Sequence, residues 1–136
     1  MAITSAICNS FKTEILTGTH NFTASSGNTF NLALYTSSAS LGASTTAYTT
    51  SNEVSGTGYT AKGNALTSVT PTLDSSTAVC DFADTSFTSA SFTARGCLIF
   101  NDTASGDPSV CAIDFGADKT VTSGTFTIQF PAADAS

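Results

Sequence analysis

The sequence predicts an all-β fold, an antiparallel β-sandwich or a Greek-key, barrel-like domain, with one short N-terminal helix. Composition is the first reason, because 20 serines and 25 threonines make up a third of the 136 residues. Threonine suits a pleated surface and serine gathers in turns. Charged residues are only 10% of the chain, so the glutamate, lysine and arginine that favour helices are scarce. Finally, apolar residues alternate with period two in about seven to nine short segments separated by turn residues.

Helical periodicity occurs once, near the N-terminus. Three apolar residues recur at every fourth position and would share one face of a helix: Ile7, Phe11 and Ile15. Asn9 or Ser10 is predicted to cap the start of this helix, and Gly18 to end it. A helix of about ten residues is marginal on its own. We therefore expect it to dock on the domain, with residues 1–10 forming an N-terminal arm.

Two regions in the first two thirds of the chain have the pattern of strands. Residues 29–36 alternate, and their predicted inward face holds Phe30, Leu32 and Leu34. Residues 66–71 and 77–82 flank a turn-like segment and predict a β-hairpin. Between the two regions, the Ser/Thr-rich residues 37–51 are predicted to form a long loop with a short strand near Tyr48.

The last third of the chain contains the strongest strand pattern, over residues 92–100. One predicted face of this strand holds Phe92, Ala94, Gly96, Leu98 and Phe100. The other face holds Thr93, Arg95, Cys97 and Ile99. Residues 101–109 are rich in turn formers, and residues 110–115 return as a strand. Residues 124–130 close the sheet, with three residues predicted to face the core: Phe126, Ile128 and Phe130.

The charge pattern argues against several partners. The net charge is −6, and the four cations are scattered along the chain as Lys12, Lys62, Arg95 and Lys119. A phosphate backbone needs clustered lysine or arginine, so we expect no nucleic acid partner. No segment approaches the ~18 apolar residues of a membrane span, and the start of the chain has no signal-peptide pattern. We expect one domain over residues 1–136 that has no membrane partner and is made in a bacterial cytoplasm.

The four cysteines are Cys8, Cys80, Cys97 and Cys111. No pair has the C-x-x-C spacing of zinc or redox sites. In a reducing compartment we expect four free, mostly buried thiols that act as small hydrophobic residues. The alternative is a disulfide between Cys97 and Cys111, which would face each other across a hairpin.

No residue is predicted to be catalytic or to bind a cofactor. His20 is the only histidine, and no signature such as G-x-S-x-G supplies a nucleophile for it, so we expect a structural role. Three glycines in EVSGTGYTAKG lack the spacing of a phosphate-binding loop and are expected to form bends: Gly56, Gly58 and Gly63.

No residue is predicted to hold a metal either. Asp102 and Asp107 share a loop with Gly106, and oxygen-rich loops can bind Ca²⁺. The spacing of an EF-hand is missing, and the chemistry of turns explains these residues equally well.

Five segments, in order, carry a resemblance to a known family: FKTEILTGTHNFT (11–23), FNLALYTSSASL (30–41), NEVSGTGYTAKGNAL (52–66), ARGCLIFND (94–102) and DFGADKTVTSGTFTIQFP (114–131). Over nearly the whole chain they resemble a family of small structural proteins of tailed-bacteriophage virions. Members of this type look like capsid decoration, or cement, proteins, which clamp neighbouring major capsid subunits from outside.

The resemblance implies a structural protein of the virion, a capsid decoration protein that binds the major capsid protein on the outer surface of the head. It implies no enzymatic activity and no small-molecule substrate. Placement around symmetry axes favours a homo-oligomer, most simply a trimer. The alternative within the virion is a tail, head-fibre or host-surface binding component. Outside a virus, a secreted carbohydrate-binding or adhesin-like β domain would also fit the composition.

Overall fold

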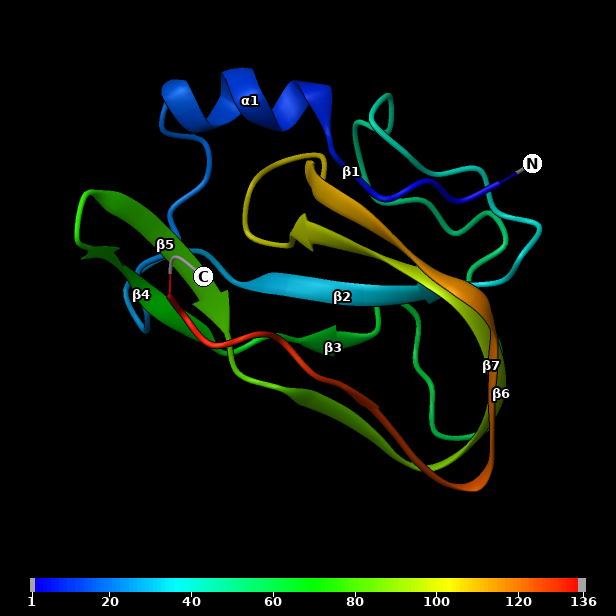
Figure 1. The fold of residues 1–136 in the computed structure, drawn as a ribbon. Helices are drawn as coiled ribbons and strands as arrows, with labels where there is room; N and C mark the ends of the chain where they lie inside the picture. Colours follow the sequence, from blue (N-terminus) through cyan, green and yellow to red (C-terminus); the bar gives the residue numbers. More distant parts are fainter. Residues whose placement is uncertain (1, 135–136) are drawn as a thin grey trace.

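The structure, a computed structural model, describes residues 2–134 (Figure 1). Its elements are β1 Ala6–Ile7, α1 Asn9–Leu16, β2 Phe30–Tyr35, β3 Asn64–Ala65, β4 Ser68–Asp74, β5 Thr77–Phe82, β6 Thr85–Asn101 and β7 Ser109–Ile128. Five strands form one antiparallel sheet in the order β1-β7-β6-β2-β3, and β4 and β5 form a second sheet. The prediction of an all-β, sandwich-like domain with one short helix is confirmed.

The predicted segments of the last third belong to two long strands, the 17-residue β6 and the 20-residue β7. The two strands pair along their whole length and bend together, so that one half of the hairpin turns back beneath β2 (Figure 1). The half near residues 97–112 carries β2 and β1 at its sides. The other half pairs residues 85–94 with residues 119–128 and forms the second layer of the domain.

The bend lies where the ladder between β6 and β7 is interrupted. Ala94 pairs with Lys119 and Gly96 pairs with Asp114, so residues 115–118 of β7 lie opposite the single residue Arg95. Extra residues on one strand bend it and increase its twist. This large bulge therefore turns the hairpin back on itself.

Arg95 and Asp114 hold the bulge in place. The Arg95 Nε donates to Asp114 Oδ1 at 3.1 Å, and the guanidinium lies 3.6 Å from Asp118. The same Asp114 oxygen accepts the N–H of Gly116 at 2.9 Å. Gly116 has a φ of +81°, a backbone conformation that other residues adopt only with strain.

The bend overturns the predicted faces of residues 92–100. Phe92 and Ala94 point into the same core as Cys97 and Ile99, although the alternation of the sequence predicts opposite faces for these two pairs. Leu98 and Phe100 point into a second core on the other side of the sheet. The register shifts between Ala94 and Gly96, so the alternation of faces restarts there, and strict period two does not hold across it.

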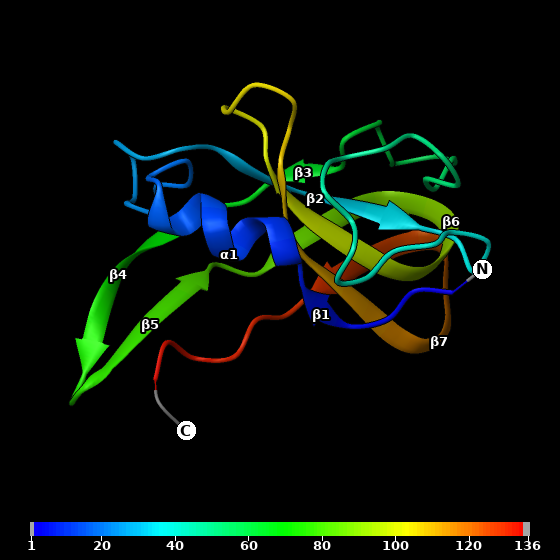
Figure 2. The ribbon, with the colours of Figure 1, turned by 90° about the horizontal axis from the view of Figure 1, so that it is seen from above.

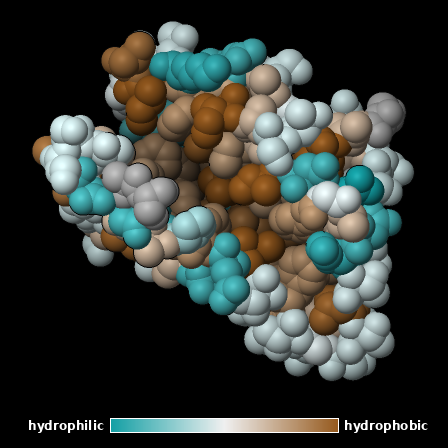
Figure 3. Space-filling view, viewed as in Figure 1, coloured by the Kyte–Doolittle hydropathy of each residue, from teal (hydrophilic) through white to brown (hydrophobic). Residues whose placement is uncertain are grey.

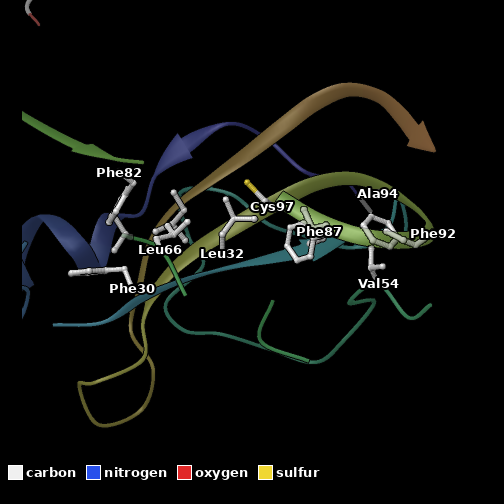
Figure 4. Packing of buried hydrophobic residues seen from close by; sticks show 13 residues of the cluster. Phe30, Leu32, Val54, Leu66, Phe82, Phe87, Phe92, Ala94 and Cys97 are labelled. Atoms are coloured by element: carbon white, nitrogen blue, oxygen red, sulfur yellow. The ribbon is translucent and has the colours of Figure 1, made fainter. Parts of the chain in front are cut away.

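The first core lies between the two halves of the hairpin (Figure 4). Phe30, Leu32 and Leu34 enter it from β2, as predicted, and are fully buried. Phe87 and Phe92 of the folded-back half close it from below.

The second core explains why β2 is buried on both faces. Ala33 and Tyr35 point into it, opposite the three residues of the first core. The N-terminal segment and the loop over residues 37–51 cover it, contributing Ile3, Cys8, Ala39 and Leu41. In that loop the predicted short strand is reduced to a single bridge between Ala47 and Pro108.

Phe126, Ile128 and Phe130 face the first core but are only half-buried, contrary to the prediction that they lie inside it. The reason is their place in the sheet. Among the described residues, β1 pairs only with the part of β7 at Cys111 and Ala112, so this end of β7 is an outer strand.

The helix α1 begins one residue earlier than predicted, at Asn9 itself. Cys8 is the N-cap residue and makes no side-chain capping hydrogen bond, so neither Asn9 nor Ser10 caps the helix. The C-terminal end is as predicted: Gly18 has a φ of +77°. The N–H of Thr19 donates to the Glu14 carbonyl at 3.0 Å, which is the bond of a Schellman motif.

Residues 2–8, part of the predicted arm over residues 1–10, are packed into the domain. The N–H of Thr4 donates to the Leu41 carbonyl at 2.9 Å, and β1 pairs with β7. Ile3 and Cys8 are buried in the second core. This segment therefore contributes to the stability of the fold.

The predicted hairpin over residues 66–71 and 77–82 is present as β4 and β5. Its turn is tighter than expected, with only Ser75 and Ser76 between the strands and a φ of +56° at Ser75. In the view from above, the hairpin projects from the domain beside α1 (Figure 2).

A pair of phenylalanine substitutions tests the two depths of burial. Phe30→Ala should lower the free energy of unfolding by about 3–5 kcal/mol, because its ring is fully buried. Phe126→Ala should cost clearly less, because its ring is half-exposed. Urea denaturation of both variants measures the difference, and equal losses would contradict the described position of Phe126.

Acid should weaken the bend. The Gly116 N–H and the Arg95 guanidinium hold the pKa of Asp114 below its ordinary value of 3.8. A lowered carboxyl pKa stabilises the fold above the unfolded-state pKa, and this stabilisation is lost as the pH falls through the folded-state pKa. Urea denaturation between about pH 5 and pH 2 should therefore show a shallower loss of stability for Asp114→Asn than for the wild type. The control Asp118→Asn keeps Asp114 and should follow the wild type.

Candidate functional site

His20 has a structural position. It is buried and lies between the rings of Phe11 and Phe30, with centroid separations of 4.9 and 6.1 Å. Asn101 Nδ2 donates to His20 Nδ1 at 3.2 Å, which leaves the proton on Nε2, 3.5 Å from Glu14 Oε1. Both ring nitrogens are thus engaged, and the imidazole ties the segment after α1 to the end of β6.

The acidic loop with Asp102 and Asp107, for which no metal was predicted, already holds a cation of the protein. Lys62 Nζ lies 2.7 Å from Asp102 and 2.9 Å from Asp107. It also lies over the rings of Tyr48 and Phe100, at 5.6 and 5.9 Å from their centroids. Any metal ion in this loop would have to displace Lys62.

Glu53 is the centre of a second polar network beside the first. Its carboxylate accepts hydrogen bonds from Tyr48 at 2.6 Å, from Tyr59 at 2.7 Å and from the N–H of Lys62 at 2.8 Å. Desolvation, and then the bond to Glu53, raises the pKa of Tyr48 to about 12. Each of these groups has a partner within the fold, so the network fixes the 48–62 segment.

The glycine-rich segment packs its backbone against strands. A Cβ on Gly63 would lie 1.8 Å from the Leu32 carbonyl oxygen, and one on Gly58 would lie 2.8 Å from the Ala90 Cα. Both glycines have positive φ. Close approach between backbones therefore accounts for these residues, in line with the predicted bends.

The surface carries an apolar trough with two lobes. Space filling shows apolar side chains gathered in a hollow between α1, the β4–β5 hairpin and the β6–β7 strands (Figure 3). Both lobes share six lining residues: Ala78, Val79, Cys80, Phe82, Ile99 and Cys111. We call this feature the apolar trough.

The helix lobe of the trough lies between α1 and the hairpin and has a volume of about 390 Å³. Ile7, Phe11 and Ile15, the predicted docking face of the helix, line one side of it. Only Phe11 docks as expected, since Ile7 is 50% exposed and Ile15 is 38% exposed. The described lining of this lobe holds no charged or hydroxyl side chain.

The C-terminal lobe has a volume of about 540 Å³ and runs along the whole of β5. Its floor adds Ile113 to the shared residues, and residues 130–134 form the wall opposite β5. Both charged residues among its described lining, Asp81 and Asp134, are acidic.

A chain of four phenylalanines connects the walls of the trough. Phe11 of α1 contacts Phe22 at a centroid separation of 6.0 Å, and Phe22 contacts Phe82 of β5 at 6.1 Å. Phe82 then contacts Phe130 of the C-terminal segment at 5.8 Å. Aromatic contacts of this kind fix the walls relative to one another, so the trough is part of the rigid fold.

The lining of the trough suits a macromolecular partner better than a small ligand. Small-molecule sites combine apolar walls with a few polar groups that orient the ligand, and the helix lobe offers none of these groups among its described side chains. Exposed apolar patches rimmed by polar residues are typical of protein interfaces. In the sequence, the apolar stripe of the helix is the one partial sign of this trough.

Two of the four cysteines, Cys80 and Cys111, line the trough, and none of the four is bridged. All four are free thiols. Cys8 and Cys97 are buried and Cys111 is half-buried, as expected of mostly buried thiols, but Cys80 is exposed. Cys97 pairs with Ile113 and Cys111 pairs with Ile99, so the two candidates for a disulfide are not direct cross-strand partners. Burial raises the pKa of Cys111 to about 12.

Comparisons with known proteins add no assignment to this site. No protein-family model, curated protein or solved structure matches the chain. Among residues 2–134, no three His, Cys, Asp or Glu side chains are placed to hold a metal ion together. The described part of the chain also contains no helix with the length and apolarity needed to cross a membrane.

The thiols offer a test of the trough. In the folded protein Cys80 should react first with a thiol reagent, because it is the exposed cysteine, although desolvation and Asp81 raise its pKa. Cys8 and Cys97 are buried, and burial raises the pKa of Cys111 to about 12, so these three should react more slowly. After unfolding in denaturant, four thiols should react. A folded protein with two fast thiols, or an unfolded one with only two, would contradict this arrangement.

Proposed function

We propose that this protein is a structural component of a tailed-phage virion, a capsid decoration protein that binds the major capsid protein on the outer surface of the head. The observation that supports this most is the apolar trough, a rigid, exposed, apolar surface on an otherwise hydroxyl-rich and acidic molecule. A partner protein that covered the trough would remove this surface from water. The five ordered segments that resemble structural proteins of tailed-phage virions are the reason for proposing the major capsid protein as the partner.

Other features of the structure are compatible with a scaffold that binds rather than reacts. The side chains of His20, Glu53 and Asp102, which are of the types found in catalytic and metal sites, have partners within the fold. We therefore propose that the protein is not an enzyme and that its contacts with the capsid are apolar contacts and hydrogen bonds. Few cations are available for ionic contacts, so binding should survive moderate salt.

We further propose that copies of the protein assemble around the symmetry axes of the capsid, most simply as a trimer. Repeated modest contacts around an axis raise avidity far above that of one contact. The competing proposal is a tail, head-fibre or host-surface binding component, for which an apolar interface would serve equally well. The two differ in copy number, because decoration requires hundreds of copies in each particle.

Two neighbouring residues at the end of α1 allow a matched test. Ile15→Asp places a charge in the helix lobe of the trough, whereas Leu16→Asp places the same charge at a side chain that is 87% exposed and lines neither lobe. Both changes put an acidic residue in the last helical turn, so their effects on the helix should be similar. Ile15→Asp should reduce binding to capsids about tenfold or more, and Leu16→Asp should bind like the wild type.

The measurement is cosedimentation of each purified variant with expanded capsids that lack their own decoration, with occupancy determined from the pellet. Free capsid subunits serve as the comparison and should bind more weakly, because a decoration site is formed by several subunits together. Association of the wild type with tails alone would overturn the decoration proposal. Equal binding of the two variants to capsids would show that the trough does not take part in binding.

A further inference from the structure

We propose that the C-terminal lobe of the apolar trough binds an extended peptide segment, which pairs with the free edge of β5 as an added strand and carries a basic residue at its flank. The inference rests on the proposed function in taking this segment to belong to a capsid subunit. The binding mode itself follows from the edge of β5, the floor of the lobe and its charge.

The first argument is the unpaired edge of β5. Within the described chain, β4 is the only strand that pairs with it, and β4 lies on one side of it. No backbone hydrogen bond joins β5 to residues 130–134 across the lobe. The other edge of β5 therefore presents backbone N–H and carbonyl groups that an incoming strand can pair with.

The second argument is the shape and lining of the lobe. Every residue from Thr77 to Phe82 lines it, so the lobe follows β5 over its full length. Ile99, Cys111 and Ile113 form an apolar floor beneath that edge. A strand added to a sheet directs alternate side chains to each face, so every second side chain of the segment would enter this floor.

The third argument is charge, which decides between a partner protein and a second copy of this chain. The charged residues among the described lining are the carboxylates of Asp81 and Asp134. Two copies joined edge to edge through β5 would bring these acidic lobes together on molecules with a net charge of −6 each. Like charges brought together at an interface lower the affinity. A lysine or arginine beside the inserted segment would instead be attracted to the acidic side chains of the lobe.

The test uses a synthetic peptide of alternating valine and threonine with a lysine at each end. Binding is followed by the rate at which a thiol reagent modifies Cys80, the exposed cysteine of β5. At about nine times the dissociation constant, about a tenth of the sites are free, so modification should slow about tenfold. Amide hydrogen exchange of β5 should slow at the same peptide concentrations.

Two controls separate strand pairing from simple adsorption. The same peptide methylated at alternate backbone nitrogens keeps its side chains but loses N–H donors, and it should leave the Cys80 rate unchanged. Asp81→Lys should weaken binding of the lysine-flanked peptide and favour a glutamate-flanked one. Equal effects of the methylated and unmethylated peptides, or no effect of either peptide at millimolar concentration, would overturn the inference.

Analytical ultracentrifugation of the protein alone checks the competing occupant. A dimer in which Cys80 is protected from the thiol reagent would assign the edge of β5 to a second copy of the chain and overturn the inference. Because the peptide experiment contains no capsid, its result is independent of cosedimentation. Peptide binding without capsid binding would reject the decoration role alone, and capsid binding without peptide binding would reject strand addition alone.

Discussion

A hairpin with strands of 17 and 20 residues can bury both of its ends against one core only if it folds back on itself. In this protein the fold occurs where residues 115–118 lie opposite Arg95. The contacts of Arg95 with Asp114 and of Asp114 with Gly116 hold it. This bend creates the first core and the second layer of the domain. It also places the C-terminal end of β7 at the outer edge of that layer.

The apolar trough is a consequence of the same geometry. The two halves of the bent hairpin enclose the first core, and β5 and the C-terminal segment lie beside its open end, joined through Phe82 and Phe130. The β4–β5 hairpin forms a sheet of its own, and two-stranded sheets are marginal when isolated. A partner strand on β5 would both cover apolar surface and give this hairpin a third strand.

Several charged residues stabilise the fold through ion pairs between distant segments. Lys62 pairs with both Asp102 and Asp107 across 40 and 45 residues of sequence, and Arg95 pairs with Asp114. The chain is otherwise rich in hydroxyl and apolar side chains and has a net charge of −6. Such a surface can bind a neighbour through shape and hydrogen bonds, which is what a decoration protein is proposed to do.

The local sequence pattern by itself determined several features of the fold. These are the all-β class, the burial of Phe30, Leu32 and Leu34, the β4–β5 hairpin and the end of α1 at Gly18. These features depend on neighbours within a few residues. The faces of residues 92–100 and the trough could not be predicted in this way. The bulge places Arg95 opposite residues some 20 positions away, and the lining of the trough comes from segments spread between Ile7 and Asp134. Period two describes a regular ladder, and only the tertiary structure decides where the ladder breaks and which apolar side chains are left without cover.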